Sequence, residues 1–286
     1  MEKKWNIVKY QKRLYNDLIQ TSDDIHTKGT INMGKVISIS NQKGGVGKTT
    51  TTCNLAAGLK QKGFRVLIID LDAQGNLGFS VGADTDTSAS IYDVLKGNSK
   101  TQYAIQKTGT TDIIISSIML SGIELEFTNT GREYLLKEAI KPILEFYDYI
   151  LLDTPPALGI LTINAFTASD TIIVPMLSDI FSLQGIAQLY ETVERVKKYC
   201  NPSLTIAGIL LTKYNPRTHL SQEIRGTAEL IAQDLSIKLF DTTIRNSVAV
   251  SESQSVQQSI LEYAPNNNTA KDYLQFTEEL LAKGVI

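Results

Sequence analysis

A loop rich in glycine and lysine holds the side chains best suited to chemistry in this chain. Its residues are Lys43, Gly44, Gly45, Val46, Gly47, Lys48, Thr49 and Thr50. Glycines allow successive backbone N–H groups to turn toward one anion, and the amino end of a following helix adds partial positive charge. Lys48 supplies a full positive charge, and the Thr49 hydroxyl is suited to binding Mg²⁺. The sequence therefore predicts a binding site for nucleotide phosphates.

The loop departs from the strict pattern G-x-x-x-x-G-K-[ST] at one position. Gln42 stands where the first glycine belongs, and Lys43 gives the loop a second lysine. The alternative is an ordinary surface turn. It is disfavoured because an apolar strand is expected before the loop, at 36–40, and a helix after it, through 54–59.

Three aspartates follow segments that are expected to be buried strands. The apolar, β-branched segment 65–72 ends in Asp70 and Asp72, and the segment 149–153 ends in Asp153. Ligands of open α/β sheets bind outside the carboxyl ends of strands, so these acids are expected near the phosphates. A period of two places Asp70 and Asp72 on one side of an extended strand. Asp153 is expected near Mg²⁺, acting through water. Taken singly, each aspartate could instead be a turn former or a helix cap.

These motifs resemble those of ParA-type partition ATPases, within the deviant Walker family that also holds MinD-like proteins and the nitrogenase iron protein. The resemblance covers about residues 34–286. Besides the loop it rests on 70–76, 153–156 and 174–185. In the last segment an acidic residue, an aromatic, a small residue, Leu and Gly follow a Val-Pro strand end, which is similar to the ParA branch in particular.

The resemblance implies an α/β fold: a single-domain P-loop NTPase with a twisted, mostly parallel sheet and helices on both faces. The alternation of strand and helix patterns favours the same architecture. The implied activity is hydrolysis of ATP with Mg²⁺. Lys48 is expected to neutralise the β- and γ-phosphates, and Asp72 to orient the attacking water. By resemblance, Lys43 reaches across a homodimer to the partner's ATP. Thr49, Asp70 and Asp153 are the expected magnesium-site residues.

Non-specific DNA and a centromere-binding adaptor are the further partners that the resemblance implies. A net charge of −2 and a pI near 5.8 argue against a general nucleic-acid binder, but a dimer can unite local basic residues into one patch. The candidates for DNA binding are Arg195, Lys197, Lys198, Arg217, Arg225 and Arg245. Each could also be an ordinary solvated charge.

Two segments near the carboxyl end resemble the family's adenine-approaching segments. They span 212–219 and 243–252, and the candidate adenine contacts are Lys213, Arg245 and Asn246. The family's I-P-R-N-x-R core falls on 244–249, where Arg245 replaces the proline and Ala249 the later arginine.

Residues 1–33 are expected to form an N-terminal helical extension and linker ahead of the ParA-like domain at 34–286. Apolar side chains recur at helical spacing between about residues 3 and 20. They are Trp5, Val8, Leu14, Tyr15, Leu18 and Ile19. Such a helix could pack on the ATPase body, or serve dimerisation or partner docking.

A cytoplasmic, nucleoid-associated protein without membrane anchoring is expected. The sequence has no run of 18 apolar residues and no signal-peptide core. The segment 272–283 is acidic in its middle, and its apolar stripe is expected to dock on the protein core. That stripe consists of Leu274, Thr277, Leu280 and Leu281.

Three functions stay open at this point. The leading one is a DNA-segregation ATPase that ATP switches between a DNA-bound dimer and a released state. The second is a ParA-like positioner of a protein cargo. The third is a metabolic P-loop enzyme, such as a ligase that activates a small carboxylate with ATP.

Overall fold

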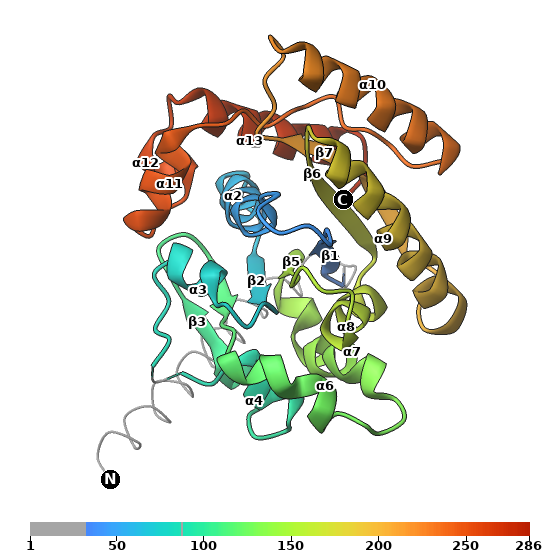
Figure 1. Cartoon of the computed structure of the whole chain (residues 1–286). Coiled ribbons are helices and arrows are strands. Elements are labelled where there is room, and N and C mark those ends of the chain that lie inside the picture. Colours follow the sequence, from blue (N-terminus) through green and yellow to red (C-terminus); the bar gives the residue numbers. More distant parts are fainter. Residues whose placement is uncertain (1–32, 87) are drawn as a thin grey trace.

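Apolar runs of the chain form the strands of a central sheet, which the computed structural model describes together with its helices over residues 33–86 and 88–286 (Figure 1). The strands are β1 (Lys35–Ile39), β2 (Val66–Asp70), β3 (Ile105–Lys107), β4 (Asp112–Ile114), β5 (Tyr149–Asp153), β6 (Thr171–Leu177) and β7 (Thr205–Thr212). Their order is β3-β4-β2-β5-β1-β6-β7, and only the β3–β4 pair is antiparallel. The predicted α/β fold with a mostly parallel sheet is confirmed.

The helices alternate with the strands along the chain. The α-helices are α2 (Lys48–Gln61), α3 (Asn76–Ser80), α4 (Ile91–Leu95), α5 (Thr101–Ala104), α6 (Ile123–Glu126), α7 (Leu135–Ile140), α8 (Ile160–Ala168), α9 (Ile180–Tyr199), α10 (His219–Asp234), α11 (Val248–Ser255), α12 (Ile260–Tyr263) and α13 (Asn268–Ala282). Three 3₁₀ helices are η1 (Ile118–Gly122), η2 (Arg132–Tyr134) and η3 (Lys141–Phe146).

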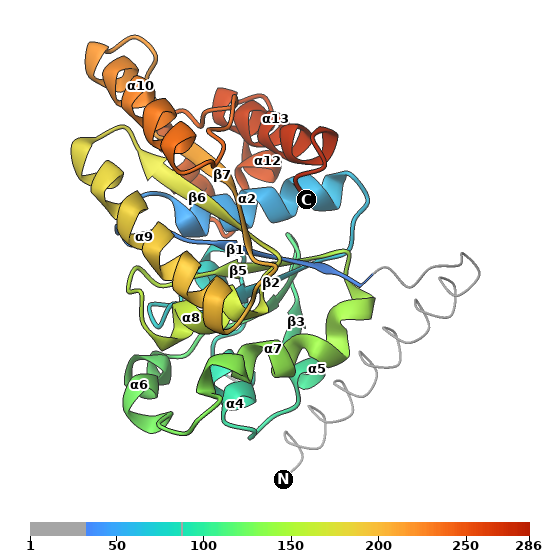
Figure 2. The ribbon, with the colours of Figure 1, turned by 90° about the vertical axis from the view of Figure 1, so that its right-hand side faces the viewer.

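Two hydrophobic layers cover the two faces of the sheet. Successive strand residues such as Val36 and Ile37 point into different layers, because side chains alternate along a strand. One layer is completed by helices that include α4, α7, α8 and α9, and the other by α2, α12 and α13 (Figure 2). Burial on both faces explains why the strands are almost continuously apolar in sequence.

The carboxyl-terminal helix α13 docks on α2, as its apolar stripe predicts. Thr277 and Leu280 are fully buried, whereas Leu274 and Leu281 are only partly buried. The largest contributions come from Tyr273 and Phe276, and Phe276 meets the Phe240 ring edge-on, with the centroids 5.1 Å apart. No helix within residues 33–86 and 88–286 is long and apolar enough to span a membrane.

Replacement of Gly58 by alanine is expected to destabilise the fold at the α2–α13 contact. The new Cβ would lie 2.4 Å from the Thr277 Oγ atom, closer than real Cβ contacts. Overpacking of this kind costs about 1–3 kcal/mol, more than alanine gains over glycine in a helix. Urea unfolding of Gly58→Ala should therefore show a lower midpoint than the wild type.

The matched control is Gly226→Ala in α10, where the added Cβ meets nothing within 4 Å. That variant should be neutral or slightly stabilised. Adding Thr277→Ala to Gly58→Ala should recover part of the loss, since it removes the clashing hydroxyl. Equal midpoints for wild type and Gly58→Ala would contradict the close packing.

The sequence interpretation of residues 1–32 lies outside the described part of the chain, so the N-terminal helix stays a prediction. Elsewhere, the strand expected around 113–115 is β4, and the helix expected at about 184–199 lies within the longer α9.

Candidate nucleotide-binding site

The predicted phosphate loop joins the carboxyl end of β1 to the amino end of α2. Gly45 and Gly47 have φ angles of 73° and 88°, in the left-handed region that side chains with a Cβ rarely adopt. The Thr51 N–H donates to the Gly47 carbonyl over 2.8 Å and begins the helix. The glycines are therefore required by the backbone path, and the loop opens at a helix amino terminus, where anions bind favourably.

Two neighbouring strands hold the loop in place. The Thr212 hydroxyl at the end of β7 donates to the carbonyl of buried Val46 over 2.7 Å. The Asn41 side-chain amide donates to the Pro175 carbonyl of β6 over 2.7 Å, and its oxygen accepts from the Lys43 N–H over 3.0 Å. These contacts tie the loop to the carboxyl ends of β6 and β7.

Lys48 lies inside the loop with only 7% of its surface exposed. Its Nζ donates to the Lys43 carbonyl over 3.2 Å. Burial lowers the pKa of Lys48, while the charges of Asp153 and Asp72 act in the opposite direction. The structure therefore brings together the lysine and two of the acids that the sequence selected. A partly desolvated ammonium interacts strongly with an anion because little solvent screens it.

Lys43, the second lysine of the loop, points to a different element. Its Nζ lies 2.5 Å from Oδ2 of Asp179, the residue that caps α9. The other oxygen of Asp179 accepts from the Ser182 N–H over 2.9 Å. Asp179 belongs to the segment that marks the ParA branch in sequence, so the structure links two of the motifs directly.

Asp72 does not share an extended strand with Asp70, and the period-of-two argument for this pair was wrong. β2 ends at Asp70, and Asp72 starts a turn in which its Oδ1 accepts from the Gln74 N–H over 3.0 Å. The Ser116 hydroxyl donates to the Asp72 carbonyl over 2.5 Å and holds the turn from the end of β4. The carboxylate itself is half-exposed and lines the cavity beside the phosphate loop.

Asp70 is fully buried, and its carboxylate anchors the segment between β2 and α3. It accepts the N–H groups of Asp72 (3.0 Å), Leu77 (3.1 Å) and Gly78 (3.3 Å). Burial raises its pKa to about 7, and these hydrogen bonds act in the opposite direction. The geometry shows that Asp70 positions the turn that contains Asp72. A role of Asp70 in binding Mg²⁺ stays a prediction.

Asp153 is the group best suited to a divalent cation. It is 1% exposed, and both carboxylate oxygens lack a hydrogen-bond partner within the described residues. Burial, followed by the charge of Asp70, raises its pKa well above the ordinary range, whereas nearby Thr49 and Lys48 lower it. A buried carboxylate without partners is costly unless a cation accompanies it. In residues 33–86 and 88–286 no three His, Cys, Asp or Glu side chains gather as a cage. Mg²⁺ fits, because it binds through one or two protein groups, waters and phosphates.

A cavity of about 540 Å³ opens over the loop and could hold the rest of a nucleotide. Sequence reasoning selected six of its residues from the loop and Asp72 and Lys213 from elsewhere. Ser251 of α11 lies in the segment 243–252 that was expected near the adenine, whereas Phe79 of α3 and Gln254 and Ser255 of α11 were missed. The Gln254 amide donates to the Thr50 hydroxyl over 3.3 Å across 204 positions of the sequence. No local pattern reports such a contact.

The three adenine candidates are placed differently. Lys213 lines the cavity, and its Nζ donates to the Gly45 carbonyl over 3.1 Å. Arg245 and Asn246 are not among the lining residues. The guanidinium of Arg245 instead binds both oxygens of buried Asp272 on α13, with the nearest pair 2.5 Å apart. Their adenine role stays a prediction, and the geometry supports Lys213 over Arg245.

The DNA candidates do not form one cluster of uncompensated charge. Lys197 pairs with Glu194 (3.2 Å), Arg225 with Glu229 (3.0 Å) and Arg245 with Asp272. Arg195 and Lys198 are exposed near the end of α9, and Arg217 is exposed before α10. The DNA role of all six residues stays a prediction.

The fold and the site together define a P-loop NTPase: a glycine-rich loop between β1 and α2, with acidic residues after the neighbouring strands β2 and β5. Comparison with known proteins makes this more specific. A family described as an AAA domain matches residues 34–206. The chain is 40% identical over 256 residues to the sporulation initiation inhibitor protein Soj of Bacillus subtilis, covering 88% of this chain and all of Soj. It is 39% identical to the chromosome partitioning protein ParA of Caulobacter vibrioides, covering 87% of this chain and 94% of that protein. The chain belongs to the ParA-type partition ATPase family.

Solved structures agree with this assignment. Cobyrinic acid a,c-diamide synthase of Mycobacterium smegmatis, with ADP and magnesium bound, has a TM-score of 0.76 and 32% identity over 88% of this chain and 96% of that one. A putative plasmid partition protein of Borrelia burgdorferi, bound to AMPPNP, has a TM-score of 0.74 and 26% identity over 87% of this chain and 99% of that one.

Proposed function

We propose that this protein is an Mg²⁺-dependent ATPase that segregates DNA. ATP assembles it into a sandwich dimer that binds DNA without sequence preference, and a centromere-binding adaptor stimulates hydrolysis. The observation that carries the proposal is a two-lysine phosphate loop whose Lys48 lines one cavity with Asp72, in a chain that belongs to the partition family. Association with the nucleoid follows from DNA binding.

The chemistry proposed is transfer of the γ-phosphoryl group to water. Phosphoryl transfer needs positioning and charge neutralisation more than a covalent nucleophile. Lys48 is buried in the loop and neutralises the phosphates, while Asp72, which lines the same cavity, orients the water. Thr49 and Asp153, with Asp70 nearby, would hold Mg²⁺, which supplies further neutralisation of phosphate charge when bound.

The proposed dimer requires Lys43 to change partners. In the single chain its ammonium binds Asp179, and in the dimer it would bind the ATP of the partner subunit. Asp179 would then still cap α9, because it also accepts the Ser182 N–H. The exchange is feasible because both side chains are about one-third exposed, and ion pairs of this kind contribute only about 0–1 kcal/mol.

Lys43→Ala is therefore expected to bind ATP with little change but to lose ATP-dependent dimerisation and hydrolysis. Binding is measured with a fluorescent ATP analogue, dimerisation by light scattering, and turnover by phosphate release. Lys60→Ala, at an exposed lysine of α2, is the matched control and should behave as the wild type. Normal turnover by Lys43→Ala would remove the cross-subunit role.

The decisive experiment for the whole proposal is DNA binding by the wild-type chain with ATP, with ADP and without nucleotide. Affinity for a DNA of arbitrary sequence should be highest with ATP, because the dimer doubles the number of phosphate-binding cations. Equal affinity in all three states would overturn the DNA-segregation function.

A metabolic ligase is the second candidate, because the synthase from M. smegmatis is 32% identical over nearly the same length. That function predicts a small carboxylate as cosubstrate, stimulation of ATP turnover by it, and no effect of DNA. A ParA-like positioner of a protein cargo would use the same fold and chemistry, and capture of a cargo protein would separate it from DNA segregation.

A further inference from the structure

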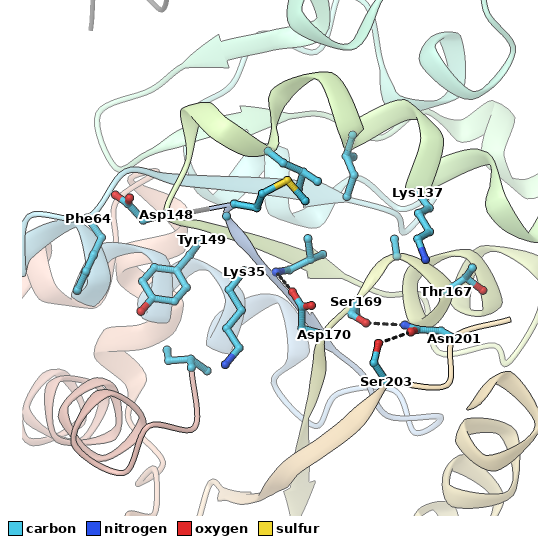
Figure 3. A pocket seen from close by; sticks show the side chains of 17 residues that line it. Lys35, Phe64, Lys137, Asp148, Tyr149, Thr167, Ser169, Asp170, Asn201 and Ser203 are labelled. Atoms are coloured by element: carbon cyan, nitrogen blue, oxygen red, sulfur yellow. Dashed lines mark hydrogen bonds between the residues drawn. The ribbon is translucent and has the colours of Figure 1, made fainter. Parts of the chain in front are cut away.

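A second cavity, of about 590 Å³, lies at the opposite edge of the sheet from the phosphate loop. Figure 3 shows it beside the amino ends of β1 and β5, where Lys35 and Tyr149 begin their strands. Its wall includes a set of apolar side chains from several elements: Val36, Phe64, Ile140, Leu144, Tyr149 and Ala168. The nucleotide site uses none of these residues.

Several polar groups around this amino-edge cavity are engaged within the chain. Asp170 accepts from the Val36 N–H over 2.8 Å, and the Lys35 Nζ donates to the Val285 carbonyl over 3.2 Å. Figure 3 shows the Asn201 amide turned to Ser169, where it donates to the carbonyl over 2.6 Å. A small polar ligand is specified by polar groups that face it. Lys137 lines the cavity as well, so the lining is mixed in polarity, and its apolar part is the surface that an amphipathic segment of a protein could cover.

The described chain begins in the wall of this cavity. Met33 and Gly34 line it, and the Gly34 N–H donates to the Leu144 carbonyl over 2.9 Å. A Cβ at Gly34 would lie 2.3 Å from the Tyr147 carbonyl oxygen, so only glycine lets the chain pass so close to η3. Met33 is 67% exposed at the rim. Residues 1–32 are therefore tethered at the cavity itself.

The proposed ATPase function does not account for this N-terminal segment. The family match begins at residue 34. The alignment with Soj covers all of Soj but only 88% of this chain. Yet residues 1–32 carry the apolar series that starts at Trp5 and recurs at helical spacing. An apolar stripe of this kind needs a surface to cover it.

We propose that residues 1–32 dock in the amino-edge cavity of their own chain through this apolar series. A short tether keeps the segment near the cavity at an effective concentration on the order of millimolar, so weak contacts suffice. The volume falls within the range of about 300–1,000 Å³ that holds ligands of several rings, which is enough for an indole and neighbouring aliphatic groups. Docking of the segment would cover the apolar wall and fix the start of β1.

The test uses Trp5, the only tryptophan of the chain, as a reporter in the full-length protein. In the wild type, the fluorescence of Trp5 should have its maximum at short wavelength and should be protected from quenching by acrylamide. Both should hold at any protein concentration. Ala168→Glu places a carboxylate in the cavity wall and should shift the emission to the red and raise the quenching constant several-fold. Ala187→Glu, at an exposed alanine of α9, is the matched control and should leave both unchanged. Circular dichroism verifies that the variants fold, and Ser203→Glu at the exposed rim replaces Ala168→Glu if that variant does not.

Quenching of wild-type Trp5 as strong as in an isolated peptide of residues 1–32 would overturn the proposal. So would protection that rises with protein concentration, which indicates a second copy, or protection that appears only with added DNA. The readout does not involve ATP turnover, so this proposal and the proposed function fail separately.

Discussion

Lys48→Ala is expected to lower ATP turnover by about 10² to 10³, the loss typical of one well-placed stabilising donor. Lys48 is the cation held inside the phosphate loop, buried and bonded to the Lys43 carbonyl. Its charge is weakly screened there, so its removal affects the developing negative charge strongly. Phosphate release with saturating ATP and Mg²⁺ measures the effect, and binding of a fluorescent ATP analogue shows whether affinity falls as well.

Lys60→Ala again serves as the control, because it removes an exposed lysine of the same helix. A loss below about tenfold in Lys48→Ala would mean that this loop is not where ATP is hydrolysed. Lys48→Ala also removes a loop hydrogen bond, so thermal unfolding of the variant is needed to separate a folding defect from a catalytic one.

The features that the sequence predicted correctly are local in the chain. The strand, the phosphate loop and the helix follow one another between Lys35 and Gln61, and the glycines at positions 45 and 47 have the positive φ angles that the loop requires. Strands that end in an aspartate bring Asp70 and Asp153 together, because parallel neighbours end at the same edge of the sheet. The order of the strands in the sheet was not predicted.

The features that the sequence did not predict depend on contacts between distant segments. Gln254 reaches the loop from α11, and Asp179 reaches Lys43 from the start of α9. The buried face of α13 is built around Tyr273 and Phe276, and which side chains of the helix face the core depends on how it docks on α2. Asp72 was placed on a strand because periodicity does not reveal where a strand ends, and the Ser116 contact that holds its turn is 44 positions away.

Arg245 illustrates how a departure from a family pattern changes the use of a side chain. The residue stands where the family has a proline, and its guanidinium binds Asp272 of α13, which is 8% exposed at the side chain. Two parallel N–H to oxygen contacts make this pair geometrically specific. The arginine therefore ties the segment before α11 to α13. The cation is less available for DNA than its sequence position implies.

Asp72→Ala is expected to trap the proposed ATP-bound, DNA-binding state. The carboxylate lines the cavity, and the alanine leaves the phosphate loop itself unchanged, so ATP should bind as in the wild type. Hydrolysis should fall by about 10² or more, the contribution typical of a group that positions or deprotonates the nucleophile. DNA affinity with ATP should match or exceed that of the wild type and persist over time, because the nucleotide is no longer consumed.

A salt series makes this prediction specific. If the trapped dimer binds DNA phosphates, the logarithm of its affinity should fall linearly with the logarithm of salt concentration, with a slope of about −0.9 per phosphate neutralised. Asp234→Ala, at an exposed aspartate at the end of α10, is the matched control, because it changes the net charge equally and should hydrolyse ATP normally. The proposed switch fails if Asp72→Ala binds DNA equally with ATP, with ADP and without nucleotide, or if it shows no affinity at low salt. In either case the same fold and site would then serve a cargo positioner or a metabolic enzyme, and ATP turnover in the presence of candidate cargo proteins or small carboxylates would separate those two.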